Sequence, residues 1–353
     1  MHSPVTVRDI ARACGIHFTT VALALRNSPR VAEKTRDRVV KIANHMGYRP
    51  NPLVATLMAQ KRAQRQPSHS SVLAYISYPS LDVKDPSIFE KQYLEGARER
   101  CLEMGYRLET FHLYSGDLNA TRLAQILRTR AIPGLLLGPW RRGKGHLPRP
   151  LHGFASVALC NSLVQPGLHR VRHNQCRGSQ LACRQLRRKG YRRIGLVLTT
   201  HMDRQLDRFW TAGYLSFHEN LPAVSRPAPL YLPQNSFPAN ILSDWVLREK
   251  PDVILTMHLQ VRQWLERNAA SLTHKVDIAT LDHSPEWGDC PGIFQNPSAQ
   301  GKEAVSFLVG QIQNNQHGLP SQPLTLMLDG EWVDPGSHGP GRSPLPSSSR
   351  QQQ

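Results

Sequence analysis

Long apolar runs are missing from this sequence of 353 residues. No stretch of about eighteen apolar residues is present, which excludes a membrane-spanning helix. The amino terminus carries no hydrophobic signal segment, because Val5, Val7 and Ile10 are separated by polar and charged residues. We therefore expect a cytoplasmic protein with no membrane partner.

Paired metal ligands and disulfide patterns are also absent. The six cysteines include no Cys-x-x-Cys pair, and the sixteen histidines form no zinc-ligand set with them. We expect buried free thiols in a reducing compartment, no metal and no cofactor. The cysteines are Cys14, Cys101, Cys160, Cys176, Cys183 and Cys290.

Common enzyme signatures do not occur either. The sequence has no Gly-x-Ser-x-Gly elbow, no phosphate-binding glycine loop and no His-Glu-x-x-His motif. An enzyme is therefore not predicted.

Acidic residues are scarce, and the excess of basic residues is concentrated near the amino terminus. The chain has 44 lysines and arginines, 26 acidic residues and a formal net charge of +18 at pH 7. Residues 1–66 hold twelve lysines and arginines and three acidic residues, a net charge of +9. Half of the net charge thus lies in less than a fifth of the chain, which is typical of a phosphate-binding surface.

Residues 5–27 have the pattern of a helix-turn-helix. The i, i+3, i+4, i+7 spacing that gathers apolar side chains on one helix face is met by Val7, Ile10, Ala11 and Cys14. Thr6 is the predicted N-cap of this helix. Gly15 follows it, where a left-handed residue would end the helix and turn the chain.

Two further helices complete the predicted head. The second begins near His17 to Thr19, and its inward side chains are Val21, Ala24 and Leu25. Its outward side chains are Phe18, Thr19, Thr20 and Leu23. A third helix, from Ala32 to Gly47, carries Val39, Ile42, Ala43 and Met46 on one side. A small bundle that contacts only proteins would show the same periodicity, but the charge density argues against that alternative.

The head and the segment after it resemble the amino-terminal part of the lactose-repressor (LacI/GalR) family of bacterial transcription regulators. The matching residues are Thr6-Val-Arg-Asp-Ile-Ala-Arg-Ala-Cys-Gly-Ile16, Thr20-Val21, Arg30-Val31, Lys34-Thr35-Arg36 and Gly47-Tyr48-Arg49-Pro50-Asn51-Pro52. The resemblance implies a DNA-binding domain at residues 1–50 and a hinge helix with a linker at residues 51–70. It also implies that Leu57 wedges into the minor groove at the operator centre, although Leu57 packing on a partner helix is the open alternative.

The first turn of the second helix is expected to face base edges in the major groove. The candidate contacts there are His17, Phe18, Thr19, Thr20 and Leu23. Where most of the family has serine and arginine, this chain has Ala22 and Leu23, which predicts a different half-site and not a loss of DNA binding. Candidate phosphate contacts are Arg8, Arg26, Arg30 and Arg36, each of which could equally be a solvated surface charge, and Asn51 and Leu57 complete the set.

From Val72 onward, short apolar runs alternate with amphipathic helices such as Phe89 to Met104 and Thr121 to Arg130. The runs are Val72 to Ile76, Gly134 to Leu137, Val157 to Cys160, Ile194 to Leu198, Val253 to Thr256, Val276 to Leu281 and Leu324 to Leu328. This alternation predicts an α/β fold with two doubly wound parallel sheets.

The family resemblance implies that residues 71–336 form a two-lobed core like that of periplasmic binding proteins, which binds effector and forms the dimer. It places the first lobe at about residues 71–170 and 298–325, and the second lobe at about residues 171–297 and 326–336. Residues 337–353, rich in glycine, proline and serine, are expected to be a disordered tail.

An effector site is expected in the cleft between the lobes. Asp282 stands where the family keeps an aspartate that hydrogen-bonds effector hydroxyls, and Gln295 matches a glutamine of the interlobe crossover. Trp210 replaces the effector-binding arginine of the family, and Met257-His258 replaces an Asn-Asp pair. Since tryptophan can stack on a sugar ring, either the site has been rebuilt for another ligand or small-molecule binding has been lost.

These observations predict a sequence-specific transcription regulator, a homodimeric repressor that binds a palindromic double-stranded DNA operator. A small-molecule effector, with carbohydrates among the candidates, is expected to modulate its affinity. Two alternatives stay open: an effector-independent architectural DNA binder, and a ligand-binding protein with a vestigial head.

Overall fold

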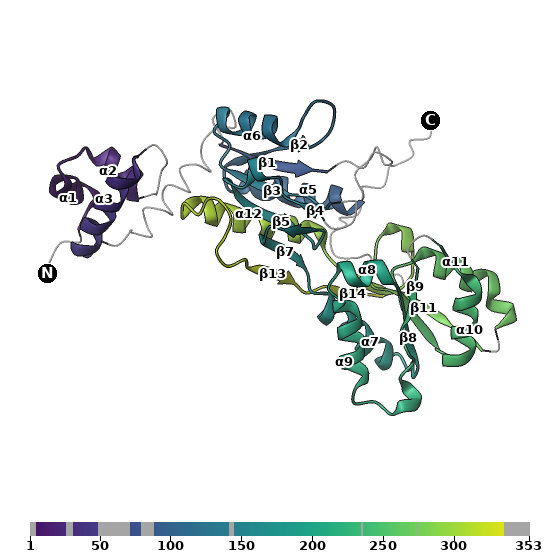
Figure 1. Ribbon diagram of the computed structural model, residues 1–353. Coiled ribbons are helices and arrows are strands. Elements are labelled where there is room, and N and C mark those ends of the chain that lie inside the picture. The colour runs from purple at the N-terminus through teal and green to yellow at the C-terminus, as the bar shows by residue number, and fades with distance from the viewer. Residues whose placement is uncertain are drawn as a thin grey trace, which may run out of the picture. The chain divides into compact units, whose positions relative to one another are not determined.

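The computed structural model describes residues 5–25, 31–48, 71–78, 88–140, 145–233, 236–272 and 274–334 (Figure 1). The predicted hinge helix and linker, residues 51–70, and the predicted tail, residues 337–353, lie outside these ranges. In the ranges that the structure describes, no helix is both long enough and apolar enough to cross a bilayer. None of the six cysteines forms a disulfide, and Cys160 and Cys176 are the two that are only half-buried.

The chain forms two compact units, each built from separate pieces of sequence. The first unit comprises Met1–Leu159, Leu163–Arg170 and Gly301–Leu324. The second comprises Cys160–Ser162, Val171–Gln300 and Thr325–Gln353.

The head consists of α1 (Val7–Cys14), α2 (Phe18–Leu25) and α3 (Glu33–His45). These bounds confirm the three helices expected from the apolar spacing. They share one small core of buried residues: Ile10, Ala11, Cys14, Val21, Ala24, Val31, Val39 and Ala43. Ile42, Met46 and Leu25, predicted to face inward, pack against this core while only partly buried.

A six-stranded sheet in the order β13-β7-β5-β3-β1-β2 has most of its strands in the first unit, whereas β13 and the end of β7 belong to the second. Its strands are β1 (Ser71–Ser77), β2 (Tyr106–His112), β3 (Gly134–Leu137), β5 (Ala155–Leu159), β7 (His169–His173) and β13 (Thr325–Leu328). The pairs β1·β2, β1·β3 and β3·β5 are parallel. Strands β1, β3 and β5 match predicted apolar runs, whereas β2 was not predicted. A separate two-stranded sheet joins β4 (Gly145–His146) to β6 (Leu163–Gln165), and a short 3-10 turn spans Arg149–Leu151.

Helices cover both faces of the first sheet. One face packs on α6 (Ala120–Thr129), whose Leu123, Ala124 and Leu127 are fully buried. The other face packs on α12 (Pro297–Gln313), which runs beside α5 (Ile88–Glu103). A side chain at Gly301 of α12 would collide with the carbonyl of Tyr93, so the two helices approach closely only because glycine stands there.

The second unit contains a six-stranded sheet in the order β14-β12-β11-β10-β8-β9. Its strands are β8 (Ile194–Thr199), β9 (Leu230–Leu232), β10 (Val253–Thr256), β11 (Asp277–Thr280), β12 (Gly292–Phe294) and β14 (Glu331–Val333). All neighbouring pairs are parallel except β12·β14, which is antiparallel. An antiparallel edge strand was not predicted from the sequence.

Alternate side chains of β8 and β10 enter two different cores. Leu196 and Leu198 join one core with α7 (Gln175–Arg188) and α9 (Phe209–His218), whereas Val197 faces α10 (Ala239–Glu249) and α11 (Leu259–Asn268). Figure 1 shows these helix pairs on opposite faces of the sheet. The remaining elements are α8 (Thr200–Gln205) and the 3-10 turns Ala223–Ser225, Ala269–Ser271 and Pro285–Trp287. The sheet therefore has the doubly wound build that continuous apolar runs predict.

Candidate nucleic-acid interface and ligand site

The first helix of the head carries its own start and stop signals. The Thr6 hydroxyl accepts a hydrogen bond from the Asp9 backbone N–H, and the Asp9 carboxylate accepts one from the Thr6 backbone N–H at 2.9 Å. This reciprocal capping box confirms Thr6 as the N-cap. The Thr6 hydroxyl also donates to the Asp9 carboxylate at 2.6 Å, and this bond, the one from the Thr6 backbone N–H and the nearby Arg12 charge lower the pKa of Asp9. At the other end, Gly15 has a φ of 65°, the left-handed conformation that glycine adopts without strain.

The third helix locks the turn between the first two. Arg38, on α3, donates a hydrogen bond of 3.0 Å to the carbonyl oxygen of Cys14. Cys14 is the last residue of α1, where carbonyl groups have no partner within the helix. The bond therefore fixes how α1 ends and how α2 is presented.

The first turn of α2 presents an exposed aromatic and polar surface. Phe18 is 43% exposed, and Thr19 beside it is exposed. The ring of His17 lies 4.5 Å from the Phe18 ring, and its Nδ1 lies 2.7 Å from the Thr19 hydroxyl. These three predicted base contacts thus form one connected surface.

Two other predicted base contacts lie differently. Thr20 is half-buried, and Leu23 packs against the core of the head while half-buried. The expectation that Leu23 faces outward is thus only partly met, because its aliphatic side chain gains more from contact with the core than from solvent.

The predicted phosphate contacts fall into two groups. Arg8 is exposed and lies on α1, with its guanidinium carbon 5.9 Å from the centre of the Phe18 ring, and Arg36 is half-buried on α3. The remaining four predicted DNA contacts, Arg26, Arg30, Asn51 and Leu57, lie outside the described residues.

In the second unit, three parallel strands end in a threonine: β8 at Thr199, β10 at Thr256 and β11 at Thr280. The buried hydroxyls of Thr256 and Thr280 each accept a hydrogen bond from the backbone N–H two residues on, at 3.1 Å and 3.0 Å. The donors belong to His258 and Asp282, which are thereby presented at the carboxyl edge of the sheet. Ligands of open α/β sheets bind at this kind of edge.

Asp282 and Gln295 lie in contact at this edge. The Gln295 side-chain amide donates to the Asp282 carboxyl at 2.8 Å and to the carbonyl oxygen of Leu281 at 3.3 Å. Burial raises the pKa of Asp282 to about 8, with a small further rise from Glu286, against the lowering effect of the Gln295 hydrogen bond. At neutral pH the carboxyl is therefore mostly protonated, so it can donate a hydrogen bond as well as accept one.

His258 lines a separate hollow of about 200 Å³ at the ends of β8, β9 and β10. Its other walls include Thr199, His201, Gln205, Leu232 and Phe237. The Nε2 atom of His258 has no hydrogen-bond partner among the described residues, and burial lowers the pKa of the imidazole. His201 and Gln205 were not predicted as ligand residues. Both follow the predicted strand at residues 194–198, and this position could have indicated them.

Trp210 lies in the hydrophobic core and not at the sheet edge. The side chain is fully buried on α9, with its ring 5.4 Å from that of His173. A side chain at Gly178 of α7 would collide with His173 and press on Trp210. Burial lowers the pKa of His173 to about 4, so the imidazole is neutral and packs as an uncharged ring. The predicted stacking of a ligand on Trp210 would therefore require neighbouring side chains to move.

The carboxyl edge of the first sheet also gathers polar and aromatic groups that were not predicted. Ser77, the last residue of β1, donates a hydrogen bond of 2.7 Å to the buried carboxylate of Glu90. The rings of Tyr78 and Trp140 lie 4.5 Å apart. These residues follow two predicted strands, but Glu90 lies on a helix whose sequence gave no sign that it would be buried.

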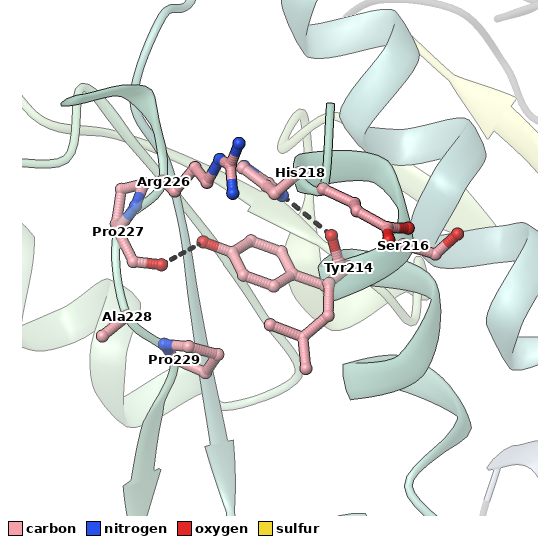
Figure 2. A pocket seen from close by; sticks show the side chains of 9 residues that line it. Tyr214, Ser216, His218, Arg226, Pro227, Ala228 and Pro229 are labelled. Atoms are coloured by element: carbon pink, nitrogen blue, oxygen red, sulfur yellow. Dashed lines mark hydrogen bonds between the residues drawn. The ribbon is translucent and has the colours of Figure 1, made fainter. Parts of the chain in front are cut away.

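A second hollow of the second unit, of about 370 Å³, lies away from the carboxyl edge (Figure 2). Tyr214 forms its floor, and the Tyr214 hydroxyl lies 2.7 Å from the carbonyl oxygen of Pro227 and 2.8 Å from that of Ile194. His218 bonds through Nδ1 to the Tyr214 carbonyl oxygen at 2.8 Å. Because Ile194 begins β8, this hollow lies at the opposite end of that strand from Thr199 and the predicted ligand residues.

The head of the chain matches a known protein family. Residues 6–51 match the sequence profile described as bacterial regulatory proteins, lacI family. The match includes all of α1, α2 and α3.

Relatives and solved structures extend the likeness to the rest of the chain. The NTD biosynthesis operon regulator NtdR of Bacillus subtilis (strain 168) is 24% identical over 196 residues, which cover 55% of this chain and 55% of NtdR. The regulator TreR of Salmonella typhimurium (strain LT2) is 26% identical over 242 residues, covering 64% of this chain and 68% of TreR. The chain thus spans about half the length of NtdR.

The structure of the Lac repressor dimer bound to operator and the anti-inducer ONPF has the same fold. It aligns with a TM-score of 0.51 at 18% identity, covering 94% of this chain and 98% of that one. Residues 6–51 are therefore similar to the lacI family of bacterial regulatory proteins, and the chain as a whole shares the fold of the Lac repressor.

Proposed function

We propose that the protein is a sequence-specific, DNA-binding transcription regulator without enzymatic activity. The observation that carries the proposal is the surface formed by His17, Phe18 and Thr19 at the start of α2. The Phe18 ring is 43% exposed and stands at the helix turn that helix-turn-helix proteins insert into the major groove. The net charge of +9 over residues 1–66 supplies the attraction to phosphates that such insertion needs.

We further propose that the regulator acts in the cytoplasm as a homodimeric repressor on a palindromic operator. A two-fold symmetric dimer presents two copies of α2 to two matched half-sites. The proposed domains are the head at residues 1–50, the hinge helix and linker at 51–70, the core at 71–336 and the tail at 337–353. The Lac repressor dimer bound to operator, whose fold this chain has, supports this arrangement.

The carboxyl edge of the second sheet supports a role for a small-molecule effector. The Gln295 amide and the Asp282 carboxyl, which are hydrogen-bonded to each other, together offer hydrogen-bond donors and acceptors to a ligand. The Nε2 atom of His258 has no partner among the described residues and offers a further one. The effector proposal is that a ligand bound by these side chains changes the affinity for DNA by a coupling free energy of about 1 to 3 kcal/mol. TreR and other relatives of this chain are regulators by name, which supports regulation over the architectural alternative.

Selection of bound DNA from a randomised pool tests the proposed function. The full-length protein is incubated with the pool at moderate salt, and bound molecules are amplified and sequenced over several rounds. We expect enrichment of one approximate palindrome, bound at least about a thousandfold more tightly than unrelated DNA. If no sequence is enriched and all DNA is bound alike, the protein is not a sequence-specific regulator.

Calorimetry with a panel of metabolites tests the effector proposal. We expect at least one ligand whose binding is abolished in Asp282→Ala and unchanged in Asp289→Ala. Asp289 is an exposed aspartate of the same unit and serves as the matched control. A ligand bound equally by both variants would show that the effector site lies elsewhere.

A further inference from the structure

The second helix of the head has little with which to read guanine. Its sequence from Phe18 to Leu25 contains no charged side chain and no side-chain amide, so Thr19 and Thr20 supply its only side-chain hydrogen-bond donors. Guanine presents two acceptors, N7 and O6, in the major groove, and the forked donors of an arginine match them best. A guanine in the half-site would therefore be read from another part of the head.

Arg8 lies where such a reader is needed. It is on α1, and its guanidinium carbon is 5.9 Å from the centre of the Phe18 ring at the start of α2. A guanidinium over an aromatic face is attracted by the ring, which limits the orientations of a long and flexible side chain. Arg8 and Phe18 line the same hollow of about 380 Å³ between α1 and α2, with Gly15 and His17 among the other walls.

The guanidinium of Arg8 is also available for a ligand. Among the described residues Arg8 has no acidic partner, because the nearest carboxylate in sequence, Asp9, bonds to Thr6 and pairs with Arg12 at 3.6 Å. Arg12 lies one turn further along α1, is exposed, lines the same hollow and carries the same charge. It differs from Arg8 in being paired with Asp9 and in having no aromatic ring beneath it among the described contacts.

We propose that Arg8, held against Phe18, reads a guanine in each half-site and so sets the sequence preference of the protein. The inference rests on the proposed DNA-binding function. It assigns Arg8 to a base contact, whereas Arg8 was predicted from the sequence as a candidate phosphate contact. Phe18 stands at the helix turn that faces base edges in helix-turn-helix proteins, so a guanidinium 5.9 Å from its ring lies beside that turn, within reach of a base edge. The exposed part of the Phe18 ring then contacts the methyl group of a thymine next to the guanine.

The charge-matched pair Arg8→Gln and Arg12→Gln separates base reading from phosphate binding. Each full-length variant loses one positive charge from the same exposed face of α1, so both should bind unrelated DNA more weakly. The slope of log K against log salt concentration should fall by about one unit in each. Circular dichroism of both variants checks that the head stays folded.

Sequence selection with the three proteins then gives the decisive comparison. We expect the wild type and Arg12→Gln to enrich the same palindrome, with a guanine beside a thymine in each half-site. We expect Arg8→Gln to lose the preference for that guanine. On a fixed operator, replacing the guanine by 7-deazaguanine, which lacks the N7 acceptor, should weaken wild-type binding about tenfold and Arg8→Gln binding less than twofold.

Two results would overturn the inference while leaving the regulator intact. One is a wild-type operator without a preferred guanine in its half-sites, and the other is an unchanged guanine preference in Arg8→Gln. A wild type that enriches no sequence would instead contradict the proposed function, together with the inference that rests on it.

Discussion

Replacing Asp282 by asparagine should change how the stability of the protein depends on pH. Burial raises the pKa of the Asp282 carboxyl to about 8 from the ordinary 3.8. The folded state thus holds this proton more tightly than the unfolded state does. The contribution of the Asp282 carboxyl to the free energy of unfolding is at its full value below about pH 4 and is lost as the pH rises toward 8. Asparagine keeps the oxygen that accepts from Gln295 but cannot ionise.

The size of the effect follows from the width of this pH range. One pH unit within it corresponds to about 1.4 kcal/mol of unfolding free energy per titrating group. From about pH 6 to about pH 7.5 the wild type would lose about 2 kcal/mol relative to Asp282→Asn. Because the side chain is only half-buried, water screens part of the penalty, and we expect a loss of about 1 to 2 kcal/mol.

Urea unfolding at the two pH values measures this difference. The unfolding of the second unit is followed for the wild type, for Asp282→Asn and for the control Asp289→Asn, which removes an exposed carboxylate from the same unit. As the pH rises from about 6 to about 7.5, we expect the unfolding free energies of the wild type and of the control to fall by the same amount, and that of Asp282→Asn to fall less. Equal pH dependence in all three proteins would show that Asp282 is ionised in the folded state, and the reasoning from burial would be refuted.

Three further substitutions test the local structure of the chain. Thr6→Ala removes the capping box with Asp9 and should destabilise α1 by about 1 kcal/mol, measured as faster amide hydrogen exchange in the head. Gly213→Ala would place a side chain 2.2 Å from the carbonyl oxygen of Cys176, so we expect a loss of about 3 kcal/mol in urea unfolding, whereas Gly153→Ala, which meets open space, should not show that loss. Tyr214→Phe removes the hydroxyl that bonds to backbone carbonyls and should lower the melting temperature by an amount that corresponds to about 1 to 2 kcal/mol; an unchanged melting temperature would show that water replaces the bond.

The head could be predicted in detail from the sequence because its signals are local. Thr6 and Gly15 end α1 by means of backbone geometry and hydrogen bonds that involve residues within a few positions. The apolar spacing likewise predicted the third helix, which runs from Glu33 to His45. Leu23 was the exception, since whether an aliphatic side chain folds back onto a core depends on the space that the other helices leave.

Most central strands of both sheets could be predicted, whereas β13 (Thr325–Leu328) was the one edge strand that the apolar runs predicted. Strands β3 and β10 have the bounds that their apolar runs predicted, Gly134–Leu137 and Val253–Thr256. They are buried on both faces and therefore read as continuous apolar sequence. Strands such as β2 (Tyr106–His112) and β9 (Leu230–Leu232) carry polar or exposed residues and gave no comparable signal.

The candidate ligand residues show what sequence position alone cannot decide. Asp282 and Gln295 lie in contact because they follow two neighbouring parallel strands, β11 and β12. Both residues were predicted from the family resemblance and not from a predicted strand order. The burial of Trp210 was not predictable from its alignment with an arginine, because it depends on space left by glycines on facing helices. Gly178 makes room beside His173 and Trp210, and Gly213 lets α7 and α9 approach.

The order of the strands along the chain has a consequence for synthesis on the ribosome. The first sheet receives β13 and its covering helix α12 only from residues 297–328, after the whole second sheet except β14 has been translated. Until then the nascent chain exposes apolar surface at β3 that Leu308 and Ile312 of α12 later cover. The core of the head is built from residues 5–48 alone, so the head can fold first, while the rest of the chain keeps apolar surface exposed until α12 has been synthesised.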